Sequence, residues 1–231
     1  MINSKDMFRN YLGLDYFFMA FVSVMMTWLF ASVALGLVVL LSWALMFFLF
    51  RKNRSVYKEL LKREEVTLLS PINGQISGVR AGVNHPIFGD NLTEVQMRIP
   101  IGVESGLNLP FNCEVAEIIE TKGKSFYRYN EFKAASEQLT KFKGILVKLT
   151  GRNGNLVGLQ MVKCHMGGSP RLWVSSGDRG KMGANFGQFP LGGTLLMYLM
   201  PEYDVIIESG SSVDNSQTFL AGLKTRAGIE V

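Results

Sequence analysis

Residues 144–162, GILVKLTGRNGNLVGLQMV, place two short apolar runs on either side of Asn153-Gly154. Asn-Gly between two such runs is the strongest short-range signal for a β-hairpin, because both residues accept the left-handed backbone of a type I′ turn. Runs of similar length recur along the chain between Gly, Asn and Pro: QISGV, EVQMRIPIGV, EVAEIIE, TLLMYLM and YDVIIES. Residues 66–231 are therefore predicted to form a mainly β (α+β) antiparallel domain, with one helical patch at 129–142.

The composition narrows the class of protein. The chain has 231 residues, of which 48% are hydrophobic and only 19% are charged, and its formal net charge is +5. Such a composition excludes a disordered chain, and the charge is too small and too scattered for a nucleic-acid-binding surface. Two cysteines, Cys113 and Cys164, cannot build a disulfide framework, and no metal-ligand spacing surrounds them.

The positive mean hydropathy comes from one region near the N-terminus. Residues 16–50 contain no charged side chain. A single transmembrane helix needs about 20 residues, so one helix over this whole stretch would overshoot the bilayer. Two short helices of roughly 17 residues, turning near Ser32–Gly36 as a hairpin or a re-entrant pair, fit the length better, and a single tilted transmembrane span is the alternative. Residues 1–53 are interpreted as a membrane anchor.

Basic residues follow the apolar run directly. Arg51, Lys52 and Arg54 lie at its C-terminal end and are expected at the membrane interface. Because basic residues favour the cytoplasmic side, the remainder of the chain is predicted to lie on the cytoplasmic face, at the inner membrane in a bacterium. Residues 54–65, RSVYKELLKREE, have the amphipathic pattern of a short juxtamembrane helix.

The chain carries few residues suited to catalysis. Its two histidines are His85, expected to be a solvated loop residue before Pro86, and His165, beside Cys164 at a strand end. Neither lies in a nucleophile elbow or another catalytic signature. No phosphate-binding glycine loop and no HExxH zinc motif occurs, so no cofactor or metal is expected.

Three separated segments carry a family resemblance. They are Ser70-Pro71-Ile72-Asn73-Gly74, then Gly187–Thr194 followed by LLMYLMP, and VIIESGSSVDNSQTFLAGL near the C-terminus. With the N-terminal apolar run, this set resembles the phosphatidylserine decarboxylase family over about residues 45–223. The resemblance implies a β domain of barrel-sandwich character behind a hydrophobic anchor.

In that family a Gly-Ser bond cleaves itself, and the serine becomes a pyruvoyl group that decarboxylates phosphatidylserine. The resemblance places the serine at Gly193, the aspartate at Asn73 and the histidine at Ser105. Glycine has no hydroxyl, so a pyruvoyl group is not possible at Gly193. Three catalytic positions are degenerate at once, which indicates a pseudoenzyme.

The leading hypothesis is therefore a membrane-anchored, non-catalytic protein. It would bind a phospholipid headgroup, or dock as an accessory subunit on a membrane protein or on another copy of itself, through a surface such as Ser169–Asn185. One alternative is an active or precursor decarboxylase with an altered nucleophile. A second is a transport adaptor with a barrel-sandwich domain, although such adaptors contain a coiled-coil hairpin and the chain has no heptad run.

Overall fold

The computed structural model describes the greater part of the chain, in two compact units, Met1–Asn53 and Arg54–Val231. The described residues are 14–30, 33–50, 67–100, 103–123, 142–151, 154–163 and 168–223. Arg51, Lys52, Arg54, the predicted helix at 54–65, nearly all of the predicted helix at 129–142, Cys164 and His165 lie outside them.

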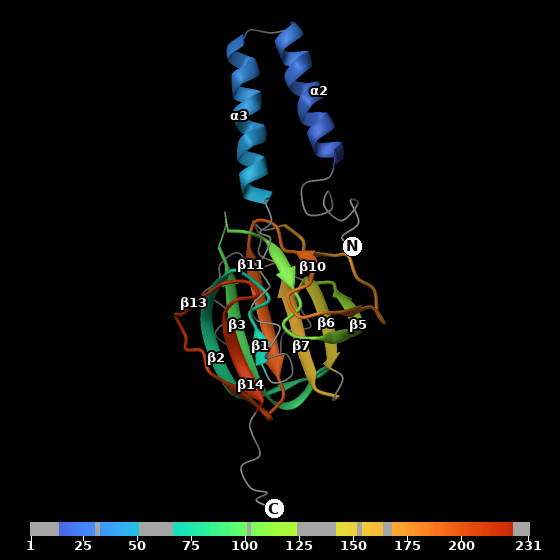
Figure 1. The fold of residues 1–231 in the computed structure, drawn as a ribbon, viewed down its shortest axis with the longest axis vertical. Helices are drawn as coiled ribbons and strands as arrows, with labels where there is room; N and C mark the ends of the chain where they lie inside the picture. Colours follow the sequence, from blue (N-terminus) through green and yellow to red (C-terminus); the bar gives the residue numbers. More distant parts are fainter. Residues whose placement is uncertain are drawn as a thin grey trace, which may run out of the picture. The chain divides into compact units, whose positions relative to one another are not determined.

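Among the described residues of the first unit, the apolar stretch forms two helices rather than one (Figure 1). Helix α2 (Leu14–Phe30) has 17 residues and α3 (Val33–Phe50) has 18. The two helices contact each other, and the indole Nε1 of Trp43 donates a hydrogen bond of 2.9 Å to the hydroxyl of Ser23. Across the described ranges, no helix has both the length and the apolar character needed to cross a membrane.

The second unit is mainly β, and all its strand pairings are antiparallel. This confirms the predicted β-rich, antiparallel fold. Its strands are β1 (Thr67–Leu69), β2 (Gly74–His85), β3 (Gly89–Ile99), β4 (Gly106–Asn108), β5 (Cys113–Thr121), β6 (Gly144–Gly151), β7 (Leu156–Val162), β8 (Arg171–Leu172), β9 (Arg179–Gly180), β10 (Asn185–Gln188), β11 (Gly193–Leu199), β12 (Tyr203–Val205), β13 (Ser212–Val213) and β14 (Phe219–Leu223).

The strands form one large and two small sheets. The large sheet has eight strands in the order β13-β2-β3-β11-β7-β6-β5-β9, and the small sheets have the orders β1-β14-β12 and β4-β10-β8 (Figure 1). The predicted hairpin is β6–β7, in which Gly144 pairs with Val162 and Thr150 with Leu156. Gly154 has the positive φ of 78° that its turn position requires.

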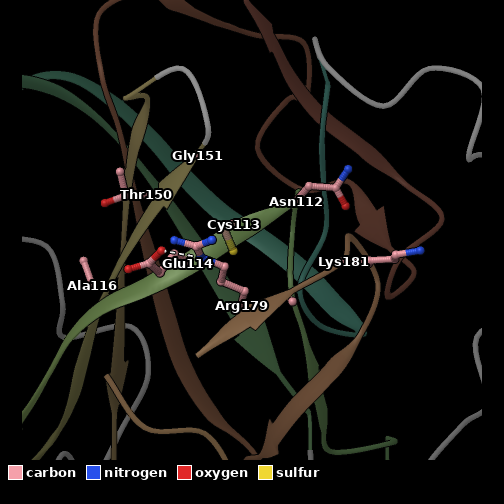
Figure 2. Close-up of a pocket in the computed structure, with 9 residues that line it drawn as sticks. Asn112, Cys113, Glu114, Ala116, Thr150, Gly151, Arg179 and Lys181 are labelled. Atoms are coloured by element: carbon pink, nitrogen blue, oxygen red, sulfur yellow. Dashed lines mark hydrogen bonds and ion pairs between the residues drawn. The ribbon is translucent and has the colours of Figure 1, made fainter. Parts of the chain in front are cut away.

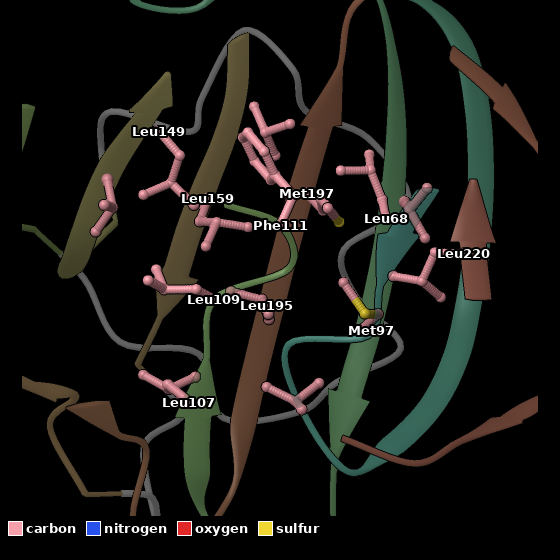
Figure 3. Packing of buried hydrophobic residues seen from close by; sticks show 14 of the residues in the cluster. Leu68, Met97, Leu107, Leu109, Phe111, Leu149, Leu159, Leu195, Met197 and Leu220 are labelled. Atoms are coloured by element: carbon pink, nitrogen blue, oxygen red, sulfur yellow. The ribbon is translucent and has the colours of Figure 1, made fainter. Parts of the chain in front are cut away.

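The main hydrophobic core lies between the large sheet and the two small sheets. Alternate residues of β11, such as Leu195 and Met197, point into it and meet Leu68 and Leu220 of the small β1-β14-β12 sheet (Figure 3). Leu107 of β4 also belongs to this cluster, which we call the inner core.

A second apolar cluster covers the opposite face of the large sheet. Leu196 and Tyr198 of β11 pack there with Phe88, from the turn between β2 and β3. Phe88 lies so close to Gly158 of β7 that a Cβ at residue 158 would be 2.5 Å from its ring. Because both faces are covered, β11 is buried along its whole length, which explains why TLLMYLM is continuously apolar instead of alternating.

Candidate functional site

Gly193 begins β11, beside Ile99 of β3. It has the same strand parity as Leu195 and Met197, so a side chain at this position would point into the inner core. The ring of Phe189, which is fully buried, already occupies that space. A Cβ on residue 193 would lie 2.3, 2.6 and 2.8 Å from three ring carbons of Phe189. The backbone can therefore take its strand position only because residue 193 has no side chain.

Ser105 lies next to this position. It is 2% exposed, and its carbonyl accepts a hydrogen bond of 2.7 Å from the backbone N–H of Phe189. Within the described part of the chain, its hydroxyl has no hydrogen-bond partner. Ser105 thus fixes the backbone of Phe189, and a serine hydroxyl cannot replace an imidazole as a base at neutral pH.

Asn73 lies in the loop between β1 and β2, and both ends of its carboxamide are hydrogen-bonded. Its Nδ2 donates to Glu104 over 3.1 Å, and its Oδ1 accepts from the backbone N–H of Asn215 over 2.7 Å. An aspartate here could keep the second bond, but it would place a carboxylate against the carboxylate of Glu104. The neutral amide at residue 73 therefore suits the negative charge of Glu104, to which it can donate a hydrogen bond.

Further amides continue this contact into a hydrogen-bonded network, in which Asn108, Asn215 and Ser216 are buried. The Asn215 side chain donates to the carbonyl of Gly106 over 3.0 Å, and its Oδ1 accepts from Ser216 over 3.1 Å. Asn108 donates to Ser216 over 2.9 Å and accepts from Asn185 over 2.9 Å. These bonds tie β4 and β10 to the turn between β13 and β14. We call this set the amide network: Asn73, Glu104, Asn108, Asn185, Asn215 and Ser216.

The structure thus brings Asn73, Ser105 and Gly193 into one neighbourhood, through Glu104 on one side and Phe189 on the other. Sequence reasoning assigned no role to either linking residue: Glu104 lies in no motif, and Phe189 lies within the segment Gly187–Thr194 without a sign of its contact with residue 193. Residue 193 has no hydroxyl, and the described residues of this neighbourhood include no nucleophile with an adjacent base. A pyruvoyl group does not fit these residues, since it would have to form from a serine at a position that the Phe189 ring excludes.

A second polar cluster lies under Phe88, and it corrects one prediction. His85 was expected to be solvated, but it is 2% exposed and its ring stacks on Phe88 at 4.4 Å. Its Nδ1 accepts hydrogen bonds from the backbone N–H groups of Ile87 and Phe88. Burial lowers the pKa of His85 to about 4. The imidazole is therefore neutral at pH 7.

Glu94 lies on the same face of the sheet. It is 1% exposed and forms an ion pair of 2.7 Å with Arg80. Burial, together with the adjacent Glu94 carboxylate, raises the pKa of Tyr198 far above its usual range. The phenol therefore stays protonated, and this cluster offers no activated nucleophile.

A groove of about 1000 Å³ runs beside β5, β6 and β9 (Figure 2). Asn112, Glu114, Thr150 and Lys181 line it, with an exposed ion pair of 2.7 Å between Arg179 and Glu114. Burial raises the pKa of the Cys113 thiol to about 12, so this cysteine is not a thiolate at neutral pH. Arg179 and Lys181 belong to the predicted surface 169–185.

Metal chemistry finds no support in the described ranges, where no group of three or more His, Cys, Asp or Glu side chains could hold an ion. In comparisons with known proteins, no protein-family model and no curated protein matches the chain. The interpretation of function therefore rests on the residues of the site and of the helical pair.

Proposed function

We propose that the chain is a membrane-attached, non-catalytic protein with a phosphatidylserine-decarboxylase-like β domain, acting as an accessory subunit or a phospholipid-binding module. The observation that carries the proposal is the contact between Gly193 and Phe189. A self-cleaving serine needs an accessible hydroxyl beside the preceding carbonyl, whereas here the position is side-chain-free and covered by a buried ring.

The pairing of Asn73 with Glu104 supports the same conclusion. A catalytic aspartate would have to hold an imidazolium by its charge, but residue 73 is an amide that donates to a carboxylate. Ser105 supplies no imidazole, and its backbone is used to hold Phe189. Two positions of the family's catalytic set thus have structural roles that catalysis would disturb.

Attachment to a membrane is supported by the helical pair. Large apolar side chains on α2 and α3 are exposed, including Phe21, Trp28 and Leu41, each by 65% or more. The basic residues after α3 favour a cytoplasmic location for the β domain. A protein held at the membrane in this way would present the β domain to a lipid headgroup or to a neighbouring membrane protein.

The proposal is tested by mass spectrometry of the full chain extracted in mild detergent. Denaturing spectra of the wild type and of Gly193→Ser should each give one intact chain of about 25.8 kDa. Native spectra should then show a defined phospholipid or protein adduct. Two fragments, with the smaller beginning near residue 193, would instead establish a self-processing decarboxylase. A bare monomer carrying neither lipid nor protein would refute the accessory role.

A further inference from the structure

Large apolar side chains are exposed on both α2 and α3. On α3 the exposed residues include Val33, Leu35, Leu37, Val38 and Leu41, which spread over more than half of the circumference at 3.6 residues per turn, and α2 also contacts this helix. A protein groove covers one stripe of a helix, whereas hydrocarbon surrounds it completely. Lipid is therefore the occupant that this surface fits.

The serine and threonine hydroxyls of the helical pair are hydrogen-bonded within it, as a lipid environment requires. The hydroxyl of Ser23 donates to the carbonyl of Ala20 and that of Thr27 to the carbonyl of Ser23, while Ser42 donates to Val38. The Trp43 indole donates a hydrogen bond to the hydroxyl of Ser23 on the other helix. Ser23 and Trp43 lie a similar number of residues from the break between the helices, so the pair forms an antiparallel hairpin.

The two ends of this hairpin differ in polarity. At the open end, Asp15 lies at the start of α2 and Arg51 follows α3 in sequence. At the closed end, Trp28, Leu29 and Val33 are more than 60% exposed, and Ser32 is the only polar residue from 29 to 36. If the turn emerged into water, these apolar side chains would be exposed to water.

We propose that α2 and α3 form a re-entrant hairpin, which enters the bilayer from one side and keeps its turn within the hydrocarbon. Helices of 17 and 18 residues are about 26 and 27 Å long at 1.5 Å per residue, and the hydrocarbon is about 30 Å thick. With Asp15 and Arg51 at one surface, the turn stops short of the other. This inference rests on the proposed membrane attachment.

Fluorescence quenching measures the depth of the turn directly. A Ser32→Cys variant of the full chain, in a Cys164→Ser background, is labelled with an environment-sensitive fluorophore. Cys113 can remain, because its thiol is buried and its raised pKa keeps it unreactive, and the Cys164→Ser parent checks this. Asn53→Cys provides the matched control at the open end. The labelled proteins are reconstituted in phosphatidylcholine/phosphatidylglycerol vesicles.

The probe at residue 32 should be quenched more by nitroxides deep on the acyl chains than by headgroup nitroxides, and not by iodide on either side. The probe at residue 53 should show the opposite pattern. If protein floats with the vesicles but the residue 32 probe is quenched by iodide and headgroup nitroxides, the hairpin crosses the bilayer and this inference is wrong. If the protein does not float with the vesicles, membrane attachment itself is refuted.

A charge at the turn gives an independent measurement. Ser32→Lys should lower the partition of the full chain into vesicles by about tenfold or more, because an ionised side chain within the hydrocarbon is strongly unfavourable. Asn53→Lys, at the open end, should leave partitioning unchanged. Equal partitioning of Ser32→Lys and wild type would place the turn in water and overturn the inference.

Discussion

Replacing Gly193 by serine adds a side chain where the structure has no room for one. The new Cβ would approach three carbons of the Phe189 ring to 2.3–2.8 Å, well inside van der Waals contact, and this ring is fully buried. Overpacking of this kind costs about 1–3 kcal/mol. For a chain of this size, that loss corresponds to a fall in melting temperature of about 2–12 °C.

The cause of this loss can be isolated with a double-mutant cycle. Phe189→Leu removes the three ring carbons that meet residue 193, at a cost of about 1–2 kcal/mol for the lost burial. If the contact is responsible, Gly193→Ser should cost much less in the Phe189→Leu background than in the wild type, with a coupling of about 1–3 kcal/mol. Gly78→Ser is the matched control, since its Cβ would lie 3.7 Å from the nearest atom, a side-chain oxygen of Gln96.

Stability would be measured on the full chain in detergent, by urea unfolding followed with near-UV circular dichroism, and intact mass would be recorded for each variant. Additive losses in the cycle would show that Phe189 does not exclude a side chain from residue 193. Self-cleavage of Gly193→Ser alone would refute the reasoning more strongly, because it would show that a serine there reaches a reactive geometry despite the ring.

Three further predictions concern the remaining contacts. Asn73→Asp should lower the unfolding free energy by about 1–3 kcal/mol at pH 7, because it sets a carboxylate against Glu104. The loss should shrink in acid as one carboxyl is protonated, and urea titrations at pH 7 and pH 4 would show this. His85 has a folded-state pKa of about 4 against 6.5 when unfolded, so the free energy of unfolding should fall by up to about 3 kcal/mol as pH drops from 6.5 to 4. A His85→Gln variant should lose this part of the pH dependence. Gly158→Ala should cost about 1–3 kcal/mol in urea unfolding, because its Cβ meets the Phe88 ring, and an unchanged midpoint would contradict the observed packing.

Local sequence signals predicted much of the fold. The β6–β7 hairpin follows from Asn153-Gly154 between two apolar runs, and the two helices follow from the length of the uncharged stretch 16–50. The hairpin and the helical pair each depend on residues close together in sequence, so turn chemistry and helix length are sufficient to predict them. Placement of the turn near Ser32–Gly36 was less accurate, since α3 already begins at Val33.

The contacts of the site could not be predicted because they join distant parts of the chain. Asn73 meets Glu104 across 31 residues, and Asn108 meets Ser216 across 108. His85 is buried because Phe88 folds onto Gly158, a residue in a different strand pair. No periodicity within β2 encodes that approach, so a histidine before a proline was interpreted as solvated.

The contacts of Asn73 and Gly193 have a consequence for any attempt to install hydroxyl chemistry at this end of the sheet. A serine at residue 193 needs a smaller neighbour than Phe189, and a carboxylate at residue 73 needs a neighbour other than the anion of Glu104. Each single change is penalised until its partner has also changed. The two contacts therefore couple residue 193 to residue 189 and residue 73 to residue 104, so that a serine and a carboxylate at this end of the sheet require four coordinated substitutions, with less stable proteins as intermediates.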